Sequence, residues 1–212
     1  MEAIRIDDYK NPMIHDFDVI KKILEGEKGL FEILMRRNNQ KLYRVIKSYI
    51  NDETLIKDIM QDTYIRAYEK LHQFNGKSQF STWLIRIGIN EALRELRFNQ
   101  VKKTAKSFIE DKKEMSPEKA IIQKEAKWIL EQTIESLPEK YRVVYMLSEV
   151  ENMSMKEISD CLDLSTSNVK VRIHRAKHML KNKLYELSQK PNVFEFGFSK
   201  CDDLVDIVMK NL

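Results

Sequence analysis

The sequence predicts an all-α protein made of two small helical domains joined by a charged linker, with a helix-turn-helix in the second domain. Three observations lead to this fold class. Apolar residues recur at intervals of three and four along most of the chain, as they do on the buried face of a helix. Glycine and proline are scarce, with five and four in 212 residues. Residues 101–116 are charged and lack helical periodicity, which is typical of a linker.

The first domain is predicted over residues 16–100, after an N-terminal extension of residues 1–15. Gly26 and Gly29 separate a short first helix from a longer second one, and Asn51-Asp52 forms a turn before a third helix over residues 53–71. A fourth helix is expected from about Ser81 to Phe98, and four helices in 80 or so residues make one compact bundle. The side chains expected to pack inside it include Phe17, Ile20, Ile23, Leu24, Leu34, Leu42, Ile59, Tyr64, Ile65 and Tyr68.

The second domain is predicted over residues 117–188, and a C-terminal extension covers residues 189–212. Helices are expected over residues 117–135 and 138–150, because Pro117 and Pro138 suit the first turn of a helix. The extension carries three phenylalanines and then an apolar pattern that favours a short helix over residues 201–212. It either packs back on the second domain or serves as an interaction handle, and we expect packing.

The helix-turn-helix is predicted from its two helix starts. Ser154 precedes Glu157 by three residues, which is a capping box, so a short helix should begin at Met155. The run Asp163-Leu164-Ser165 breaks the pattern, and Ser165 can cap a second, longer helix. The apolar face of that second helix is expected to consist of Val169, Ile173, Leu180 and Leu184.

The solvent face of that second helix is basic throughout. No acidic residue lies between Thr166 and Lys183, and small polar residues stand at the start of the helix, where recognition helices place their base contacts. Such a face binds phosphates, although a lysine-rich helix can also be an ordinary solvated surface. The basic residues are Lys170, Arg172, Arg175, Lys177, Lys181 and Lys183.

Composition and missing motifs exclude several classes of function. No apolar run is long enough to cross a bilayer and the N-terminus does not resemble a signal peptide, so we expect a cytoplasmic protein without membrane insertion. Cys161 and Cys201 fit neither a disulfide framework nor a zinc site, and Cys161 is expected in the core. His174 and His178 share a helix face but lack further ligands. No nucleophile, phosphate loop or carboxylate pair is present, so we predict no enzyme, metal or cofactor.

Three stretches together resemble the extracytoplasmic-function type of bacterial RNA polymerase sigma factor, in the sigma-70 family. The first is LIKDIMQDTYIRAYEKL at residues 55–71, and the second is FNGKSQFSTWLIRIGINEALRELR at residues 74–97. The third, at residues 137–180, has five short matches at the spacings of the family: Leu137-Pro138, Tyr141-Arg142, Glu157-Ile158, Val169-Lys170 and His174-Arg175-Ala176. The chain departs from the family where Leu-Ile-Lys-Asp replaces an Ala-Glu-Asp opening at residue 55. It also departs at Thr166-Ser167, so the preferred bases are not predicted.

The resemblance implies a protein that binds core RNA polymerase and directs promoter-specific initiation at minus-10 and minus-35 DNA. An anti-sigma factor is an optional further partner. Polymerase docking is assigned to Asp58, Gln61 and Asp62. Minus-35 recognition is assigned to Thr166, Ser167, Asn168, Lys170, Arg172 and Arg175. Minus-10 recognition is assigned to Phe74, Asn75, Lys77, Phe80, Arg86, Asn90, Arg94 and Arg97.

The minus-10 assignment also has a chemical basis, because promoter opening needs a pocket for an unstacked base beside a positive track for the backbone. An aromatic loop followed by arginines at helical spacing supplies both. Alternatively, Phe80 and Trp83 are core residues, as we expect for Trp83, and Asn75-Gly76 is an ordinary turn.

Two other functions fit a helix-turn-helix protein. One is a dimeric helix-turn-helix transcriptional regulator with the first domain as sensor, and the other is a helical adaptor that binds only protein.

Overall fold

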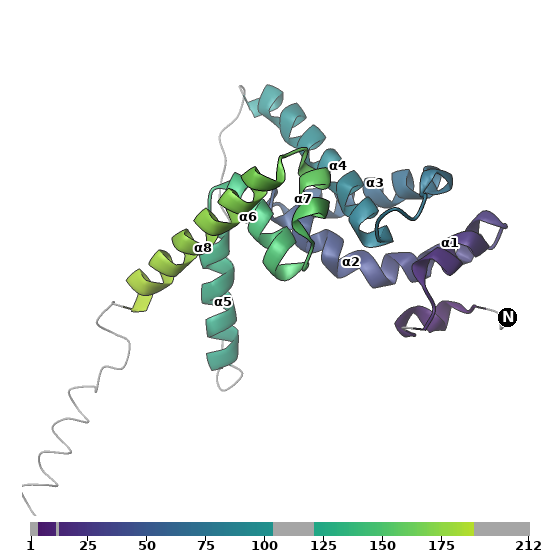
Figure 1. Ribbon diagram of the computed structural model, residues 1–212, viewed down its shortest axis with the longest axis horizontal. Helices are drawn as coiled ribbons and strands as arrows, with labels where there is room; N and C mark the ends of the chain where they lie inside the picture. The colour runs from purple at the N-terminus through teal and green to yellow at the C-terminus, as the bar shows by residue number, and fades with distance from the viewer. Residues whose placement is uncertain (1–3, 12, 104–120, 189–212) are drawn as a thin grey trace, which may run out of the picture.

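The computed structural model describes residues 4–11, 13–103 and 121–188, and these contain helices and no strand (Figure 1). The C-terminal extension and most of the predicted linker lie outside the described residues. The elements of the first domain are η1 (Ile6–Lys10), α1 (Asp16–Leu24), η2 (Lys28–Leu30), α2 (Phe31–Lys47), α3 (Glu53–Glu69), η3 (Leu71–Gln73) and α4 (Phe80–Lys103). Those of the second are α5 (Ile121–Glu135), α6 (Glu139–Tyr145), η4 (Met146–Val150, a π-helical turn), α7 (Met155–Leu162) and α8 (Thr166–Ser188).

The first domain is a bundle in which α2 packs against α1, α3 and α4. Its centre consists of fully buried aliphatic side chains from α2, α3 and α4, as the apolar periodicity predicted. A Cβ atom added to Gly88 would lie 2.6 Å from Cδ1 of Leu42, so the glycine allows α4 to approach α2 closely. Asp52 caps α3, because its Oδ1 accepts hydrogen bonds from the N–H groups of Thr54 and Leu55 at 2.9 and 3.0 Å.

The helix-turn-helix forms as the sequence predicts. Ser154 and Glu157 make both hydrogen bonds of the capping box at the start of α7. The turn passes through Asp163 in the left-handed region, with φ of 53°, and the N–H of Asn168 donates to Ser165 Oγ at 3.3 Å. A small second core, which includes Leu137, Tyr141, Ala176 and Leu180, holds α8 against α6.

Several apolar residues that were expected inside the protein lie at its surface. Phe17 is 57% exposed, Ile65 49%, Leu24 55% and Leu184 39%. The prediction was wrong at these positions because helical spacing places a residue on the apolar side of a helix but does not say how far the neighbouring helix extends over it. Two of these residues, Phe17 and Ile65, line surface cavities described below.

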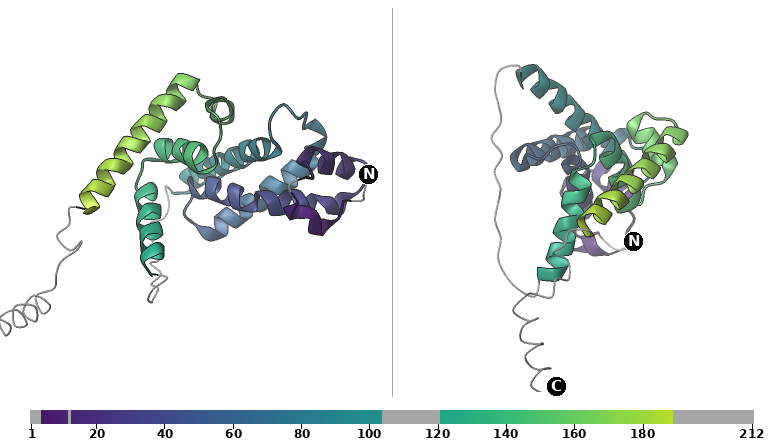
Figure 2. Two further views of the ribbon diagram at one scale, coloured as in Figure 1. Left: turned by 60° about the horizontal axis from the view of Figure 1, so that its bottom comes forward. Right: turned by 90° about the vertical axis from the view of Figure 1, so that its left-hand side faces the viewer.

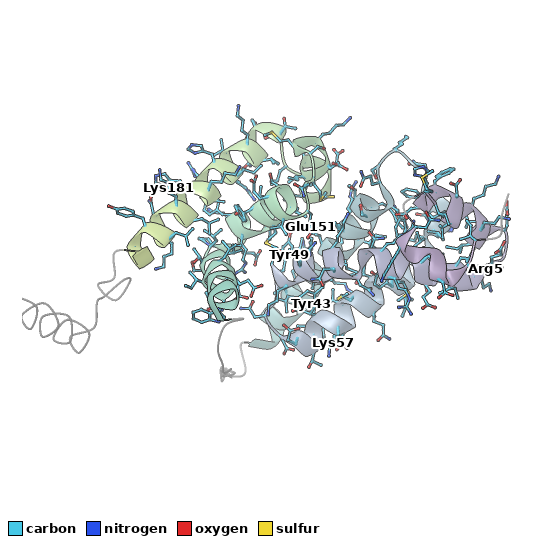
Figure 3. The ribbon with its side chains drawn as sticks, turned by 90° about the horizontal axis from the view of Figure 1, so that it is seen from below. Arg5, Tyr43, Tyr49, Lys57, Glu151 and Lys181 are labelled. Atoms are coloured by element: carbon cyan, nitrogen blue, oxygen red, sulfur yellow. The ribbon has the colours of Figure 1, made fainter. Side chains whose placement is uncertain are left out.

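The two domains pack against each other, which the sequence did not predict. The guanidinium of Arg44 on α2 forms an ion pair with Glu151 at 2.5 Å, and the Glu151 side chain is only 1% exposed. Glu151 lies where the helices of the second domain meet those of the first (Figure 3). Arg142 Nε donates to the backbone oxygen of Ser48 at 2.7 Å. One continuous hydrophobic core runs from the first domain into α6, α7 and the start of α8. In Figure 2, α8 begins beside α7 and its other end points away from the bundle.

A hydrogen bond between the domains also involves the capping box. Thr82 Oγ1 on α4 donates to Glu157 Oε1 at 2.8 Å. Burial raises the pKa of the Glu157 carboxyl, but hydrogen bonds from the N–H of Ser154, from Thr82 and from Ser154 Oγ outweigh it and leave the pKa below its ordinary value. The carboxylate form therefore stabilises α7 and its contact with α4.

A dependence of stability on pH follows from that lowered pKa. The contribution of Glu157 is present above the ordinary glutamate pKa of about 4.3 and is lost as pH falls through the lower folded value. We expect Glu157→Gln to reduce the loss of unfolding free energy between about pH 6 and pH 3, because this window extends from above the unfolded pKa to below the lowered folded pKa. Urea unfolding of both proteins at each pH measures this loss, and equal losses would contradict the assignment.

Candidate nucleic-acid and polymerase interfaces

The start of α8 presents the polar residues that were predicted to read minus-35 DNA. Thr166, Ser167 and Asn168 are all exposed, whereas Val169 on the other side of the helix is fully buried. Asn168 Oδ1 accepts a hydrogen bond from Arg172 Nε at 2.9 Å, so these two side chains are held together. A short polar turn with an attached arginine is the arrangement that recognition helices use to contact base edges.

The basic residues predicted to contact minus-35 DNA differ in their exposure and in their neighbours. Lys170 is exposed to solvent, and Arg172 is half-buried. Arg175 is exposed and its Nη1 lies 3.4 Å from the hydroxyl of Tyr141 on α6. Lys177 is 2.9 Å from Glu149, so the basic face of α8 is partly neutralised by an acid that comes from η4.

The α4 residues predicted to contact minus-10 DNA form one exposed polar face. Arg86, Asn90, Arg94 and Arg97 are all exposed and recur at helical spacing. Arg94 lies 2.7 Å from Glu91 of the same helix and 3.5 Å from Asp62 of α3. Asp62 was assigned to polymerase docking, so one exposed ion pair joins two of the predicted sites.

The minus-10 residues predicted in and beside the loop between η3 and α4 fall into two groups, aromatic residues that pack beneath the loop and polar residues that are exposed. Phe80 is 2% exposed, and the ring of Phe74 packs on Phe80 and Trp83 with centroid separations of 5.8 and 5.5 Å. Asn75 and Lys77 are exposed, and Asn75 Oδ1 accepts from the N–H of Lys77 at 3.2 Å. The three rings pack together beneath the loop, and the polar residues face solvent.

An apolar groove lies beside the residues predicted to dock on polymerase. Asp58 and Gln61 are exposed on α3, and Gln61 lines a cavity of about 590 Å³ between α2 and α3. Ile65 and Tyr68 also line it and are 49% and 37% exposed. Sequence reasoning missed this groove, although Ile65 follows Gln61 by four residues and so shares its face. The apolar and aromatic residues of the groove are Phe31, Met35, Met60, Tyr64, Ile65 and Tyr68.

The contact between the domains brings residues of the two predicted DNA surfaces together. A cavity of about 360 Å³ is lined by Asn90 and Arg97 from α4 and by Arg172 from α8. Cys161 also lines it, and its Sγ lies 3.7 Å from the backbone oxygen of Thr82. Burial raises the pKa of the Cys161 thiol to about 11, and this position in the core agrees with the prediction.

Within residues 4–11, 13–103 and 121–188, no helix is both long enough and apolar enough to span a bilayer.

Comparison with known proteins identifies the family of the chain. Residues 34–101 match the model of sigma-70 region 2, and residues 127–180 match that of sigma-70 region 4. The RNA polymerase sigma-H factor of Pseudomonas aeruginosa is 30% identical over 81% of this chain and 95% of the relative. The ECF RNA polymerase sigma-E factor of Haemophilus influenzae is 28% identical over 81% of this chain and 96% of the relative.

A solved structure agrees with these relatives. The structure of CnrH in complex with the cytosolic domain of CnrY has 26% identity and a TM-score of 0.58, and the match covers 79% of this chain and 96% of the other. The regulator and adaptor alternatives do not account for two sigma regions in this order. The chain therefore belongs to the extracytoplasmic-function group of the sigma-70 family, whose members recognise promoters for RNA polymerase and are not enzymes.

Proposed function

We propose that this sigma factor divides its work among three surfaces. The first turn of α8, including Asn168 and Arg172, reads minus-35 DNA. The loop at residues 74–80 and the exposed face of α4 hold the opened minus-10 strand. The groove beside Gln61 and Ile65 on α3 binds core polymerase. This assignment rests on the separation of two surfaces. The groove is lined by residues of α2 and α3, whereas the exposed basic face lies on α4. One bundle can therefore bind polymerase and DNA at the same time.

The domain boundaries follow the same division. Residues 16–100 form the region 2 domain and residues 117–188 the region 4 domain, with residues 101–116 as linker and residues 1–15 and 189–212 as extensions. We also propose that the protein acts in the cytoplasm, where polymerase and promoters are found. An anti-sigma factor is a further proposed partner, supported by the similar structure of the sigma factor RpoE in complex with the anti-sigma factor NepR from Bartonella quintana.

Exposed Asn75 and Lys77 provide the test of the minus-10 assignment. The Asn75 amide can reach the edge of a minus-10 base only after that base has left the stack, and the Lys77 ammonium can then hold the adjacent phosphate in place. We expect Asn75→Ala and Lys77→Ala to slow promoter opening by about tenfold, because each loses about one hydrogen bond to the opened strand, while affinity for core polymerase and for minus-35 duplex stays the same. Fluorescence of 2-aminopurine in the minus-10 element follows the opening. An unchanged opening rate in both variants would overturn the assignment.

The packed domains must separate before both promoter elements can be bound. The centres of these elements are about 25 base pairs apart, or roughly 85 Å at about 3.4 Å per base pair. Asn90, Arg97 and Arg172 instead line one cavity of about 360 Å³. Binding to the whole promoter therefore has to break the Arg44–Glu151 ion pair and expose Cys161.

Alkylation of the Cys161 thiol measures this separation of the domains, because the thiol is buried while they are packed together. Cys201 is replaced by serine so that Cys161 is the cysteine that reacts. Arg44→Met leaves the nearly buried Glu151 carboxylate without its ion-pair partner, which is strongly unfavourable at a closed interface. We expect alkylation of Cys161 to become at least about tenfold faster, because an exposed thiol has a pKa near 8.5.

A matched control is Arg36→Met, since Arg36 is also on α2 and its ion pair with Glu32 lies within that helix. Circular dichroism checks that both variants keep their helices. Equal alkylation rates in the Arg44 and Arg36 variants would contradict the proposed role of the ion pair.

A further inference from the structure

A second cavity lies where the N-terminal segment of residues 10–11 and 13–17 meets the loop at residues 74–80. Its volume is about 810 Å³, within the range of about 300 to 1,000 Å³ that is typical of small-ligand pockets. One wall is formed by Asn75, Gly76, Ser78 and Gln79, and the other by the N-terminal segment together with Arg37. The matched region 2 begins at residue 34, so the second wall includes residues outside the family match.

Phe17 is the most exposed of the three phenylalanine rings that line this cavity. Phe80 is 2% exposed, and Phe74 packs against both Phe80 and Trp83. Phe17, by contrast, is 57% exposed although it lies at the start of α1. An unstacked base gains affinity by stacking on such an aromatic face, whatever its identity.

The ring is held against the loop by a close approach at Gly76. A Cβ atom added there would lie 3.3 Å from Cε2 of Phe17, and Gly76 has a φ of +71°, which side chains rarely adopt. A residue larger than glycine would therefore crowd the ring and strain the turn. The exposed side chain of Asn75 is adjacent in the chain and lines the same cavity.

Arg37 on α2 fixes the N-terminal segment in place. Its Nη1 donates to the backbone oxygen of Ile14 at 2.8 Å and to Asp16 Oδ1 at 2.7 Å. Its Nη2 donates to the backbone oxygen of Asn11 at 3.0 Å. Because the side chains of Arg37 and Asp16 are 18% and 29% exposed, this partly buried ion pair anchors the wall and neutralises the Asp16 carboxylate, which would otherwise repel a DNA strand.

We propose that Phe17 is the stacking surface for the minus-10 base that leaves the duplex, so that the pocket has one wall from the N-terminal segment and one from the loop at residues 74–80. This inference rests on the proposed function of that loop. The base enters the cavity with its face on the Phe17 ring and its edge toward Asn75, and its phosphate lies toward Lys77.

The test measures binding of holoenzyme to a forked promoter fragment whose minus-10 non-template strand is single-stranded. We expect Phe17→Ala and Phe17→Leu to weaken binding by at least about fivefold, because stacking is lost, and Phe17→Trp to bind as well as the parent chain. Leu24→Ala is the matched control, since Leu24 is also on α1 and 55% exposed but does not line the cavity. Affinity for core polymerase and for fully duplex minus-35 DNA should stay the same in all four.

The results for Phe17→Leu and Phe17→Ala distinguish two roles of the ring, stacking on a base and packing against Gly76. If Phe17→Leu binds like Phe17→Trp, the ring only supports the loop and the stacking role is wrong. If Asn75→Ala weakens binding while Phe17→Ala behaves like Leu24→Ala, the N-terminal wall is wrong and the loop assignment stands. If neither Asn75→Ala nor Phe17→Ala weakens binding, the loop assignment and the inference fail together.

Discussion

Replacing Ile65 by aspartate is expected to reduce affinity for core polymerase by at least about 100-fold while the chain stays folded. Ile65 is 49% exposed, and substitutions at exposed positions usually change stability by about 0.5 kcal/mol or less. In the complex, however, the side chain would be covered, and an unpaired carboxylate in a desolvated apolar groove costs several kcal/mol. The effect on binding should therefore be much larger than the effect on folding.

Leu24→Asp is the control, because it adds the same charge at a similarly exposed apolar position on α1. Titration of labelled protein with core polymerase measures the affinity, and circular dichroism measures the fold. Similar affinities for the Ile65 and Leu24 variants would show that the groove is not the docking surface. Ile65 is a better test position than Asp62, since a lysine in place of Asp62 would also replace the exposed ion pair with Arg94 on α4 by a repulsion between like charges.

The second large effect is expected at Arg172. Arg172→Ala should weaken binding to minus-35 DNA by about 1 to 3 kcal/mol and change the preferred sequence, because an arginine fixed at a base edge discriminates between bases. The hydrogen bond from Arg172 Nε to Asn168 means that the two residues act as a unit. A double-mutant cycle with Asn168→Ala should therefore give an interaction energy of at least about 0.5 kcal/mol.

Lys183→Ala provides the comparison for Arg172. Lys183 is near the far end of α8 and lies 3.5 Å from Glu186, so we expect a small loss that is the same on every sequence. Binding of each variant to a minus-35 duplex and to a random duplex measures both quantities. Equal losses for Arg172→Ala on the two duplexes would show that Arg172 contacts only phosphate.

The sequence predicted the features of this fold that depend on short-range chemistry. The capping box at Ser154 and Glu157, the cap at Ser165 and the glycine break before α2 each involve residues a few positions apart, and all are present. The buried faces of α2 and α8 followed from helical periodicity, except at Leu184 near the end of α8.

The sequence could not predict features that depend on how distant segments meet. Arg44 and Glu151 are 107 positions apart, so no local pattern indicates that they pair or that the two domains close over Cys161. For the same reason Phe80 was assigned to DNA contact although it is buried under the loop, and Phe17 was assigned to the core although it lines a cavity. Whether an aromatic residue supports a site or contacts a ligand depends on the neighbouring helices.

Whether this protein directs promoter-specific initiation can be measured by transcribing fragmented genomic DNA of the host with its core polymerase, with and without the protein. Sequencing the 5′ ends of the transcripts locates every start site. We expect new start sites that share a two-part upstream motif, with Arg172→Ala changing use of the minus-35 part and Asn75→Ala changing use of the minus-10 part. If the protein added no start sites, or if neither substitution changed their use, the proposed promoter recognition would be wrong.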